Sequence, residues 1–299
     1  MKHIRRISKK KLQFYILSFI ALILASFAAK TFPANMPNAT ENLQVIFIDV
    51  GQGDSTLIRT LSGETMLIDG GEYDTYETHL KPFLREQGIK SIDTAIVTHY
   101  HSDHMGGIQL LTEDGDVKKL ILPDYSDTDN SKKHIVQAAH KTDTEVQYVS
   151  AGDIIETSCD GLSVKVVHPS RGGSEGKNFH NNSSLVLHIS YGNTSFFITG
   201  DIETRAEEEI IANNNIECDV LKVPHHGSST SSSKKFIQAA DPTYGIISAG
   251  KDNSYGHPHF ETLDTLNDED TIIYRTDTDG NITFEVTDDG IKDISFTKH

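Results

Sequence analysis

Residues 98–107 read THYHSDHMGG and hold four candidate metal ligands within six positions: His99, His101, Asp103 and His104. The run directly follows residues 93–97, which have the composition of a strand. In an extended chain, residues i and i+2 point to the same side, so the first two imidazoles can reach one ion. The aspartate and the third histidine lie in the following turn and can face a second ion. Imidazole combined with carboxylate suits zinc, manganese or iron better than calcium.

Two further strand-like segments end in residues that can bind a metal. Residues 195–199 are followed by Gly200-Asp201, and residues 219–224 are followed by His225-His226. Ligands in enzymes tend to lie on loops at strand ends, because the scaffold fixes them while one side stays open to substrate. A Gly-Asp pair alone is typical of a turn. Together with the histidine cluster, these segments indicate one composite metal site.

The order HxHxDH, Gly-Asp after a strand, and a strand ending in His resembles the metallo-beta-lactamase superfamily over about residues 43–299. Four segments also resemble the hydrolase domain of ComEC-type DNA-uptake proteins: 49–55 (DVGQGDS), 182–187 (NSSLVL), 221–228 (LKVPHHGS) and 255–258 (YGHP). The resemblance implies an α+β fold, the four-layer αββα sandwich. It also implies a two-metal hydrolase. Because the sequence holds one apolar segment, we expect a stand-alone relative of that domain, without the channel.

The resemblance further implies which residues bind the two divalent metal ions, zinc or manganese. The expected ligands are His99, His101, Asp103, His104, Asp201 and one histidine of the 225/226 pair, for which we take His225. Asp201 would bridge both ions. Asp54 would accept hydrogen bonds behind the histidines and fix their tautomers, or it would close an Asx turn in its Gly-rich loop.

One position departs from the superfamily pattern. Many members supply a third histidine to the first metal, and Asn182 stands at that place here. Three alternatives remain: Asn182 coordinates, His180 substitutes for it, or the first site is partly open. A more oxygen-rich site would favour manganese over zinc.

The expected chemistry follows from the two cations. They would lower the pKa of a water between them and hold a substrate oxygen, so no nucleophilic side chain is needed. The side chains expected to assist by orienting the water or by donating hydrogen bonds are Asp103, Asp201, His226 and His257. Contacts to substrate are expected from Asn182, Ser228 and His257. The serine run 228–233 predicts either a phosphate-binding helix start or a capping loop.

The amino terminus predicts the location. Six basic residues within residues 1–11 precede an apolar run of eighteen residues, 12–29. Such charges keep the first residues in the cytoplasm, and this length is sufficient for one spanning helix. We expect residues 1–30 to be a signal anchor in the cell membrane with the catalytic domain outside, or a signal peptide whose cleavage gives a secreted protein. Residues 31–42 would be a tether, and residues 43–299 one hydrolase domain.

The remaining pattern alternates strands and helices. Strands are predicted at 44–49, 55–59, 65–69, 163–167, 184–190, 246–248 and 281–286, and helices at 75–87, 132–140, 204–213, 234–240 and 260–266. The turn 191–193 predicts a hairpin, and Gly106-Gly107 a short helix beneath the metals. The mixture fits two facing sheets flanked by helices. Cys159 and Cys218 lack CxxC spacing, and outside the cell they could form a disulfide.

Charge bears on the substrate. The chain has 27 Lys and Arg against 43 Asp and Glu, and six of the basic residues lie in the first 29 positions. Proteins that grip long nucleic acid usually present a basic stripe. This acidic chain shows no such stripe, so binding to a long strand is expected to be weak. We therefore expect a metal-dependent phosphodiesterase or nuclease outside the cell, which acts on DNA or a smaller phosphoester that binds through the metals, and we expect no protein partner. The alternatives are a lactonase or beta-lactamase-type hydrolase and a non-catalytic, metal-stabilised binding module.

Overall fold

The computed structural model describes residues 40–125, 130–174 and 176–298. Their strands form two sheets. The first has the order β15-β14-β1-β2-β3-β4-β5-β6, with bounds β1 Leu43–Phe47, β2 Thr56–Arg59, β3 Thr65–Ile68, β4 Ile92–Ile96, β5 Val117–Pro123, β6 Glu145–Val149, β14 Asn281–Thr287 and β15 Gly290–Thr297. The second has the order β13-β12-β11-β10-β9-β8-β7, with bounds β7 Ile154–Ile155, β8 Leu162–His168, β9 Val186–Tyr191, β10 Thr194–Ile198, β11 Val220–Lys222, β12 Tyr244–Ile247 and β13 Ile272–Arg275.

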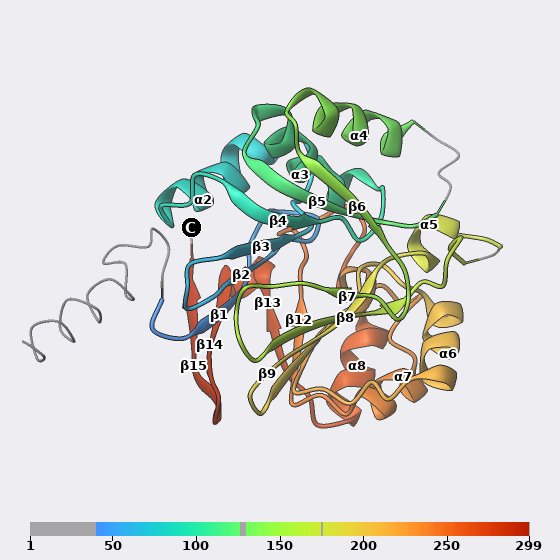
Figure 1. Ribbon diagram of the computed structural model, residues 1–299. Coiled ribbons are helices and arrows are strands. Elements are labelled where there is room, and N and C mark those ends of the chain that lie inside the picture. Colours follow the sequence, from blue (N-terminus) through green and yellow to red (C-terminus); the bar gives the residue numbers. More distant parts are fainter. Residues whose placement is uncertain (1–39, 126–129, 175, 299) are drawn as a thin grey trace, which may run out of the picture. The chain divides into compact units, whose positions relative to one another are not determined.

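Helices cover the outer face of each sheet (Figure 1). On the first sheet lie η1 Tyr76–Leu80, α2 Lys81–Glu86, α3 Ser102–Asp114 and α4 Ser131–Lys141. On the second lie α6 Thr204–Asn213, α7 Lys234–Ala240 and α8 Phe260–Asp268. Three short helices, α5 Phe179–Asn182, η2 Pro224–Gly227 and α9 Thr276–Asp279, complete the described elements.

Three apolar clusters separate these layers. The central cluster joins both sheets and includes Phe47, Phe196 and Phe284, whose rings pack edge to face around Phe284. The second cluster lies between the first sheet and α2–α4, and the third lies between the other sheet and α6–α8. Burying both faces of each sheet in this way is the main stabilising term of the fold. The predicted four-layer αββα sandwich is confirmed.

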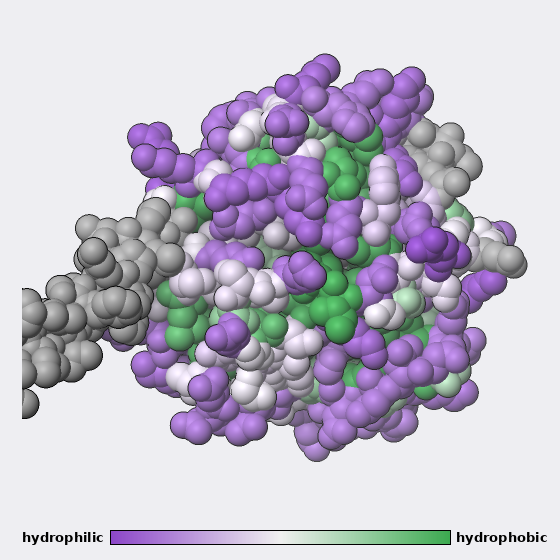
Figure 2. All heavy atoms as spheres, viewed as in Figure 1, coloured by the Kyte–Doolittle hydropathy of each residue, from purple (hydrophilic) through white to green (hydrophobic). Residues whose placement is uncertain are grey.

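The outer surface agrees with this layering. In the view of Figure 2, hydrophilic residues dominate at the top edge, over α4, and at the lower right, over α6 and α7. The helices therefore turn an apolar side to a sheet and a polar side to water, as amphipathic helices do.

The direction of the strands decides where a site can form. In the first sheet β3, β4, β5 and β6 run parallel, and in the second β10, β11, β12 and β13 do. The carboxyl ends of parallel strands meet at one edge of a sheet, and ligands of open α/β sheets bind there. The chain leaves β4, β10 and β11 directly into the three metal-binding segments predicted from the sequence.

Most predicted elements lie within two residues of their observed bounds, including α6 and α7 and the hairpin β9–β10. The helix beneath the metals is longer than predicted, because it begins at Ser102 and continues through Gly106 and Gly107. Glycine disfavours a helix interior, which obscured this element. The strands β5, β6, β7, β13 and β15 were not predicted; β15, for example, is mostly exposed and pairs only with β14.

No helix of the described segments is long and apolar enough to cross a bilayer. The predicted anchor and residues 31–39 of the tether lie outside the described residues.

Glycine in α3 is required by a close approach of two backbones. A Cβ at Gly107 would overlap the carbonyl oxygen of Gly70, in the loop after β3. We predict that Gly107→Ala lowers the free energy of unfolding by about 1–3 kcal/mol, because the helix must shift away from the sheet. Glu113→Ala, at an exposed position of the same helix, should change it by less than about 0.5 kcal/mol. Urea unfolding measures both, and equal effects would contradict this packing.

Candidate metal centre

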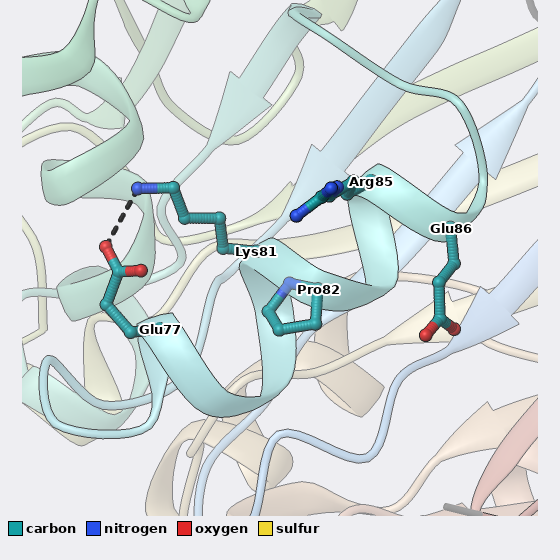
Figure 3. Close-up of a pocket in the computed structure, with 5 residues that line it drawn as sticks. All are labelled: Glu77, Lys81, Pro82, Arg85 and Glu86. Atoms are coloured by element: carbon teal, nitrogen blue, oxygen red, sulfur yellow. Dashed lines mark hydrogen bonds and ion pairs between the residues drawn. The ribbon is translucent and has the colours of Figure 1, made fainter.

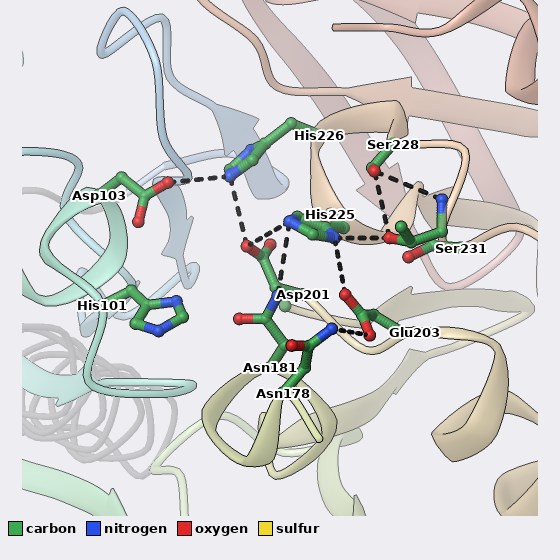
Figure 4. A network of polar contacts seen from close by, with 12 residues as sticks. His101, Asp103, Asn178, Asn181, Asp201, Glu203, His225, His226, Ser228 and Ser231 are labelled. Carbon is green, nitrogen blue, oxygen red and sulfur yellow. Dashed lines mark hydrogen bonds and ion pairs between the residues drawn. The ribbon is translucent and has the colours of Figure 1, made fainter. Parts of the chain in front are cut away.

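Side chains from both sheets converge at the carboxyl ends of the parallel strands. His99 follows β4, and Asp103 and His104 occupy the first turn of α3. Asp201 follows β10, and His226 lies in η2 after β11. Figure 4 shows His226 pointing from one side of this cluster toward both Asp103 and Asp201. Residues more than a hundred positions apart thus form one polar cluster between the two sheets.

The carboxylate of Asp201 lies at the middle of this cluster. Its Oδ1 is 3.2 Å from Nε2 of His104. Its Oδ2 is 3.5 Å from Nε2 of His226 and 3.9 Å from Nε2 of His99. The four groups are almost completely buried. A carboxylate with imidazoles on both oxygens has the arrangement that a ligand shared by two cations needs.

Two sets of ligand atoms surround that carboxylate. His99 Nε2 lies 3.0 Å from His101 Nδ1, so these imidazoles point at one place. Asp103 Oδ2 lies 3.2 Å from His226 Nε2, on the side of His104. Together with the Asp201 carboxylate, each set combines nitrogen and oxygen donors, which suits zinc or manganese.

A further row of polar groups holds the far nitrogens of two histidines. Nδ1 of His104 is 2.8 Å from Asp69 Oδ2. Nδ1 of His226 is 3.0 Å from the carbonyl oxygen of Ser248 and 3.2 Å from Asp54 Oδ1. Such contacts fix the tautomer that leaves Nε2 free for a metal. Asp54, His104, Asp201 and His226 also form a group whose ligand atoms lie within 4.8 Å of one another. Because Asp54 approaches the Nδ1 atoms, we assign it to orienting the imidazoles.

Asp69 was not singled out in the sequence. It is buried and adopts a left-handed backbone conformation, φ 57°. Its Oδ1 accepts a hydrogen bond from the amide of Thr98, and its Oδ2 one from the Thr98 hydroxyl. The available signal was an acidic residue directly after strand β3, beside β4 in the parallel sheet.

Lys222 was also missed, although a lysine inside an apolar strand is unusual. Its side chain is 1% exposed, and Nζ lies 2.8 Å from Asp54 Oδ2. Burial favours the neutral acid, yet Lys222 and His226 outweigh that effect and hold the pKa of Asp54 below its usual range. The ion pair joins β11 of the second sheet to the loop after β1 of the first.

The histidines respond to their neighbours in opposite directions. Burial lowers the pKa of His99 far below its usual value, and His104 adds to this. Burial also opposes a charge on His226, but Asp201 and Asp54 outweigh it and raise its pKa to about 10. For His104, Asp201 and Asp69 likewise exceed the effect of burial and raise the pKa. Negative carboxylates therefore create a site that stabilises positive charge.

The donor atoms fit a divalent cation. Among the described residues, His104 Nε2 and Asp201 Oδ1 are buried and make no hydrogen bond. Buried polar atoms without a partner are costly and call for an ion or another ligand. These two atoms face each other within the cluster of imidazoles and carboxylates. The centre is therefore an Asp/His cluster that could bind a metal.

The two histidines of η2 differ in position. Both adopt the left-handed conformation, with φ 51° for His225 and 54° for His226, which is strained for a residue other than glycine. The His226 ring is buried, whereas His225 is 20% exposed with Nε2 3.8 Å from Asp201 Oδ2. The geometry therefore favours His226, rather than the expected His225, beside Asp103 and His104.

The structure does not place Asn182 at the pocket. Its amide nitrogen donates to the carbonyl oxygen of Asn178, and its Oδ1 accepts from the amide of Glu203. Asn181 lines the pocket instead, and its Nδ2 is 3.5 Å from His225 Nε2 (Figure 4). The alternative residue His180 packs its ring 5.5 Å from that of His101.

Ser228 also differs from expectation. Its hydroxyl contacts the Thr230 hydroxyl, and it does not belong to the pocket lining. The helix that follows the serine run begins at Lys234, and the amides of Ser232 and Ser233 bind the buried carboxylate of Glu207. The two amides before the helix are thus occupied by an internal acid, which argues against a phosphate at this place, and the N-cap residue Ser233 makes no side-chain capping hydrogen bond.

His257 does lie at the pocket. The pocket measures about 280 Å³ and is lined by Gln52, Glu72, His101, Ser102, Asp103, Asn181, Asp201, His225, His226, Tyr255 and His257. Burial, followed by the neighbouring His226 and His225, lowers the pKa of His257 to about 4. The imidazole is thus neutral at pH 7 and can donate one hydrogen bond.

A larger hollow of about 450 Å³ lies elsewhere, along η1 and α2. Figure 3 shows its lining, which includes the ion pair of Lys81 with Glu77 at 2.8 Å. It shares no residue with the pocket at the Asp/His cluster. Such an exposed i,i+4 pair is common on helices and carries no chemistry.

Cys159 is partly exposed and Cys218 is buried, and both are free thiols. They do not form the disulfide that was considered from the sequence.

Comparison with known proteins bears on this centre. The family model described as metallo-beta-lactamase superfamily matches residues 48–251, which include every residue of the Asp/His cluster. The chain belongs to the metallo-beta-lactamase superfamily. The predicted resemblance is therefore confirmed, and a superfamily hydrolase with a candidate metal site is the activity class that follows.

Among superfamily relatives, the chain is 35% identical over 258 residues to "ComE operon protein 3" of Bacillus subtilis, which covers 81% of this chain and 33% of that protein. It is 30% identical over 275 residues to "Competence protein ComA" of Neisseria gonorrhoeae, with 91% and 36% covered. The chain thus spans about a third of the length of these relatives. The solved structure of unliganded yeast PDE1 covers 82% of this chain at 11% identity with a TM-score of 0.54, and it shows the shared fold.

The two adjacent histidines can be separated by metal content. We predict that His226→Ala loses the ion held with Asp103 and His104, because its Nε2 faces both Asp103 and Asp201. His225→Ala should retain that ion. Elemental analysis of the purified proteins measures this difference. The reverse pattern would return the ligand role to His225.

The buried ion pair behind the site can be tested by paired substitutions. Lys222→Met removes the charge and keeps the volume, so the Asp54 carboxylate stays buried without its cation. We predict a loss of about 3 kcal/mol in the free energy of unfolding of the metal-free protein. Adding Asp54→Asn should restore part of that loss, which a double-mutant cycle measures. Independent effects of the two substitutions would contradict the coupling.

Proposed function

We propose that the protein is an extracytoplasmic metal-dependent phosphodiesterase that acts on DNA or on smaller phosphoesters. The observation that carries this proposal is the convergence of imidazoles and carboxylates on Asp201 beside an open, polar pocket. The relative named as a competence protein, from Neisseria gonorrhoeae, supports DNA as the substrate. The basic residues and apolar run of residues 1–30 support a location outside the cytoplasm.

Each side chain of the pocket has a proposed role. One ion would be held by His99, His101 and Asp201, and the other by Asp103, His104, His226 and Asp201. When bound, two divalent cations, zinc or manganese, supply an acidified water and positive charge next to the scissile ester. No side-chain nucleophile is required.

The protein's own side chains would orient the metal-binding imidazoles and the attacking water, and would donate a hydrogen bond to the leaving oxygen. Asp54 and Asp69 keep the Nε2 atoms of His226 and His104 turned inward. Asp103 Oδ2 lies 3.2 Å from His226 Nε2, so this carboxylate can orient a water bound beside that imidazole. Neutral His257, at the mouth, can donate a hydrogen bond to the leaving oxygen.

The charge of the pocket argues against a beta-lactam. Such substrates carry a carboxylate apart from the scissile carbonyl, and proteins usually bind carboxylates with Arg or Lys. In the part of the chain that the structure describes, neither residue lines this pocket. A phosphodiester carries its single charge at the reacting group, where the metals themselves would neutralise it.

Hydrolysis by the full-length protein tests this proposal. With manganese or zinc we expect turnover of bis(4-nitrophenyl) phosphate and of single-stranded DNA, and no turnover of a chromogenic beta-lactam. A chelator should abolish hydrolysis of both phosphodiesters. His101→Ala should reduce turnover to background, whereas His134→Ala, an exposed histidine of α4, should not. Consumption of the beta-lactam alone, or full activity of His101→Ala, would refute the proposal.

A further inference from the structure

An exposed aromatic ring stands at the rim of the metal pocket. Tyr255 is 65% exposed and belongs to the pocket lining. It lies in the loop between β12 and α8, on the second sheet. Single exposed aromatic side chains are common on protein surfaces, so the place of Tyr255 at the pocket matters more than its exposure. Its position next to the Asp/His cluster suggests contact with substrate.

The Tyr255 ring ends a stack that leads to the centre. It is nearly parallel to the His257 ring, with 5.6 Å between centroids and 19° between planes. His257 in turn lies over His226, with 6.0 Å between centroids and an angle of 30°. The Tyr255 ring itself therefore lies two ring spacings from the metal ligand His226, and a flat group stacked on its free face would lie three spacings away.

The loop that carries Tyr255 is held in place by its own hydrogen bonds. The Oδ1 of Asn253 accepts hydrogen bonds from the amides of Tyr255 (3.2 Å) and His257 (3.0 Å). Its Nδ2 donates to the carbonyl oxygens of Gly250 (2.9 Å) and His257 (2.7 Å). His259 adds two contacts, with Nε2 near the Tyr255 carbonyl oxygen and Nδ1 accepting from the amide of Ser229. The ring is presented by a fixed loop, which reduces the entropy cost of binding.

The pocket offers little else to hold a nucleic acid. Its charged lining residues besides the histidines are Glu72, Asp103 and Asp201, all acidic. Cations bound at the centre would attract one phosphate, but neighbouring phosphates of a long strand would find no lysine or arginine among the described lining residues. Affinity must then come from an uncharged contact, and stacking of a base on an aromatic ring is such a contact.

We propose that Tyr255 is a stacking platform for one unpaired nucleobase, so that the substrate is single-stranded nucleic acid or a nucleotide-sized phosphodiester. Bases of a duplex are already stacked on each other and cannot cover the ring without being extruded. This inference rests on the proposed phosphodiesterase function.

Two substrates that differ only in the nucleoside test the platform. They are thymidine 5′-(4-nitrophenyl phosphate) and methyl 4-nitrophenyl phosphate, assayed with the manganese-loaded full-length protein. We expect a lower KM for the thymidine ester, and we expect Tyr255→Ala to raise that KM about 5- to 100-fold with little change in kcat. The KM of the methyl ester should not change. Tyr255→Phe, which keeps the ring, should behave as the wild type.

A binding measurement adds a readout that does not depend on turnover. A 2-aminopurine base in a short single-stranded oligonucleotide loses fluorescence when it stacks on an aromatic ring. We expect quenching by the wild type and by Tyr255→Phe, and loss of quenching in Tyr255→Ala. Phe260→Ala is the matched control, because Phe260 is 74% exposed in the same region and does not line the pocket.

The outcomes separate the two proposals. Turnover of both esters with no preference for thymidine, or a preference that Tyr255→Ala preserves, would overturn the stacking platform and leave the phosphodiesterase intact. If neither ester were hydrolysed by the metal-loaded protein, the proposed function would fail and the platform with it. A preference that disappears in Tyr255→Ala and remains in Tyr255→Phe and Phe260→Ala would establish the platform.

Discussion

The structure depends on bringing one buried carboxylate, that of Asp201, within 4 Å of four imidazoles, three of which are themselves buried. Those groups come from the carboxyl edges of two different sheets, so the sandwich must close before they can meet. The apolar layers supply the driving force for this closure. The polar centre, in contrast, is unfavourable in the absence of a cation, because it buries carboxylates and leaves His104 Nε2 and Asp201 Oδ1 without hydrogen bonds. The fold therefore maintains a site that a divalent metal would stabilise.

The arrangement behind the site serves the same purpose. Asp54 lies near Nδ1 of His226 and near Nζ of Lys222, and Asp69 lies near Nδ1 of His104. Each imidazole thus has one nitrogen committed to the protein and one turned toward Asp201. Buried ion pairs rarely add net stability, but they fix orientation, and orientation is what a metal ligand requires. The buried carboxylates of Asp54 and Asp69 are stabilised by the neighbouring Lys222 and His104 side chains.

Spacing along the chain predicted the residues that meet, but not how each of them points. The cluster from His99 to His104, the Gly-Asp after β10 and the histidine pair after β11 were all visible because ligand-capable residues directly followed strands. The choice between His225 and His226 could not be made from the sequence, because it depends on two left-handed backbone conformations. The exchange of Asn182 for Asn181 depends on a single short helix. A shift of one residue there reverses which amide faces the pocket, and no periodicity reveals it.

Long-range contacts account for the other differences. Asp69 and Lys222 acquire their partners only through packing between strands, so their sequence neighbours gave little sign of a role. The serine run looked like an anion site until Glu207, from a different helix, filled the helix start. The strand β15 has no alternation of buried and exposed residues, since it lies at the edge of its sheet. In each case the deciding partner is distant in the chain.

The most direct test of the account is a crystal structure of the metal-loaded protein with anomalous diffraction data at the metal edge. We predict two ions about 3.5 to 4 Å apart, with Asp201 bridging them, His99 and His101 on one, and Asp103, His104 and His226 on the other. A protein that binds no ion between these residues, or that binds one away from Asp201, would contradict the central claim.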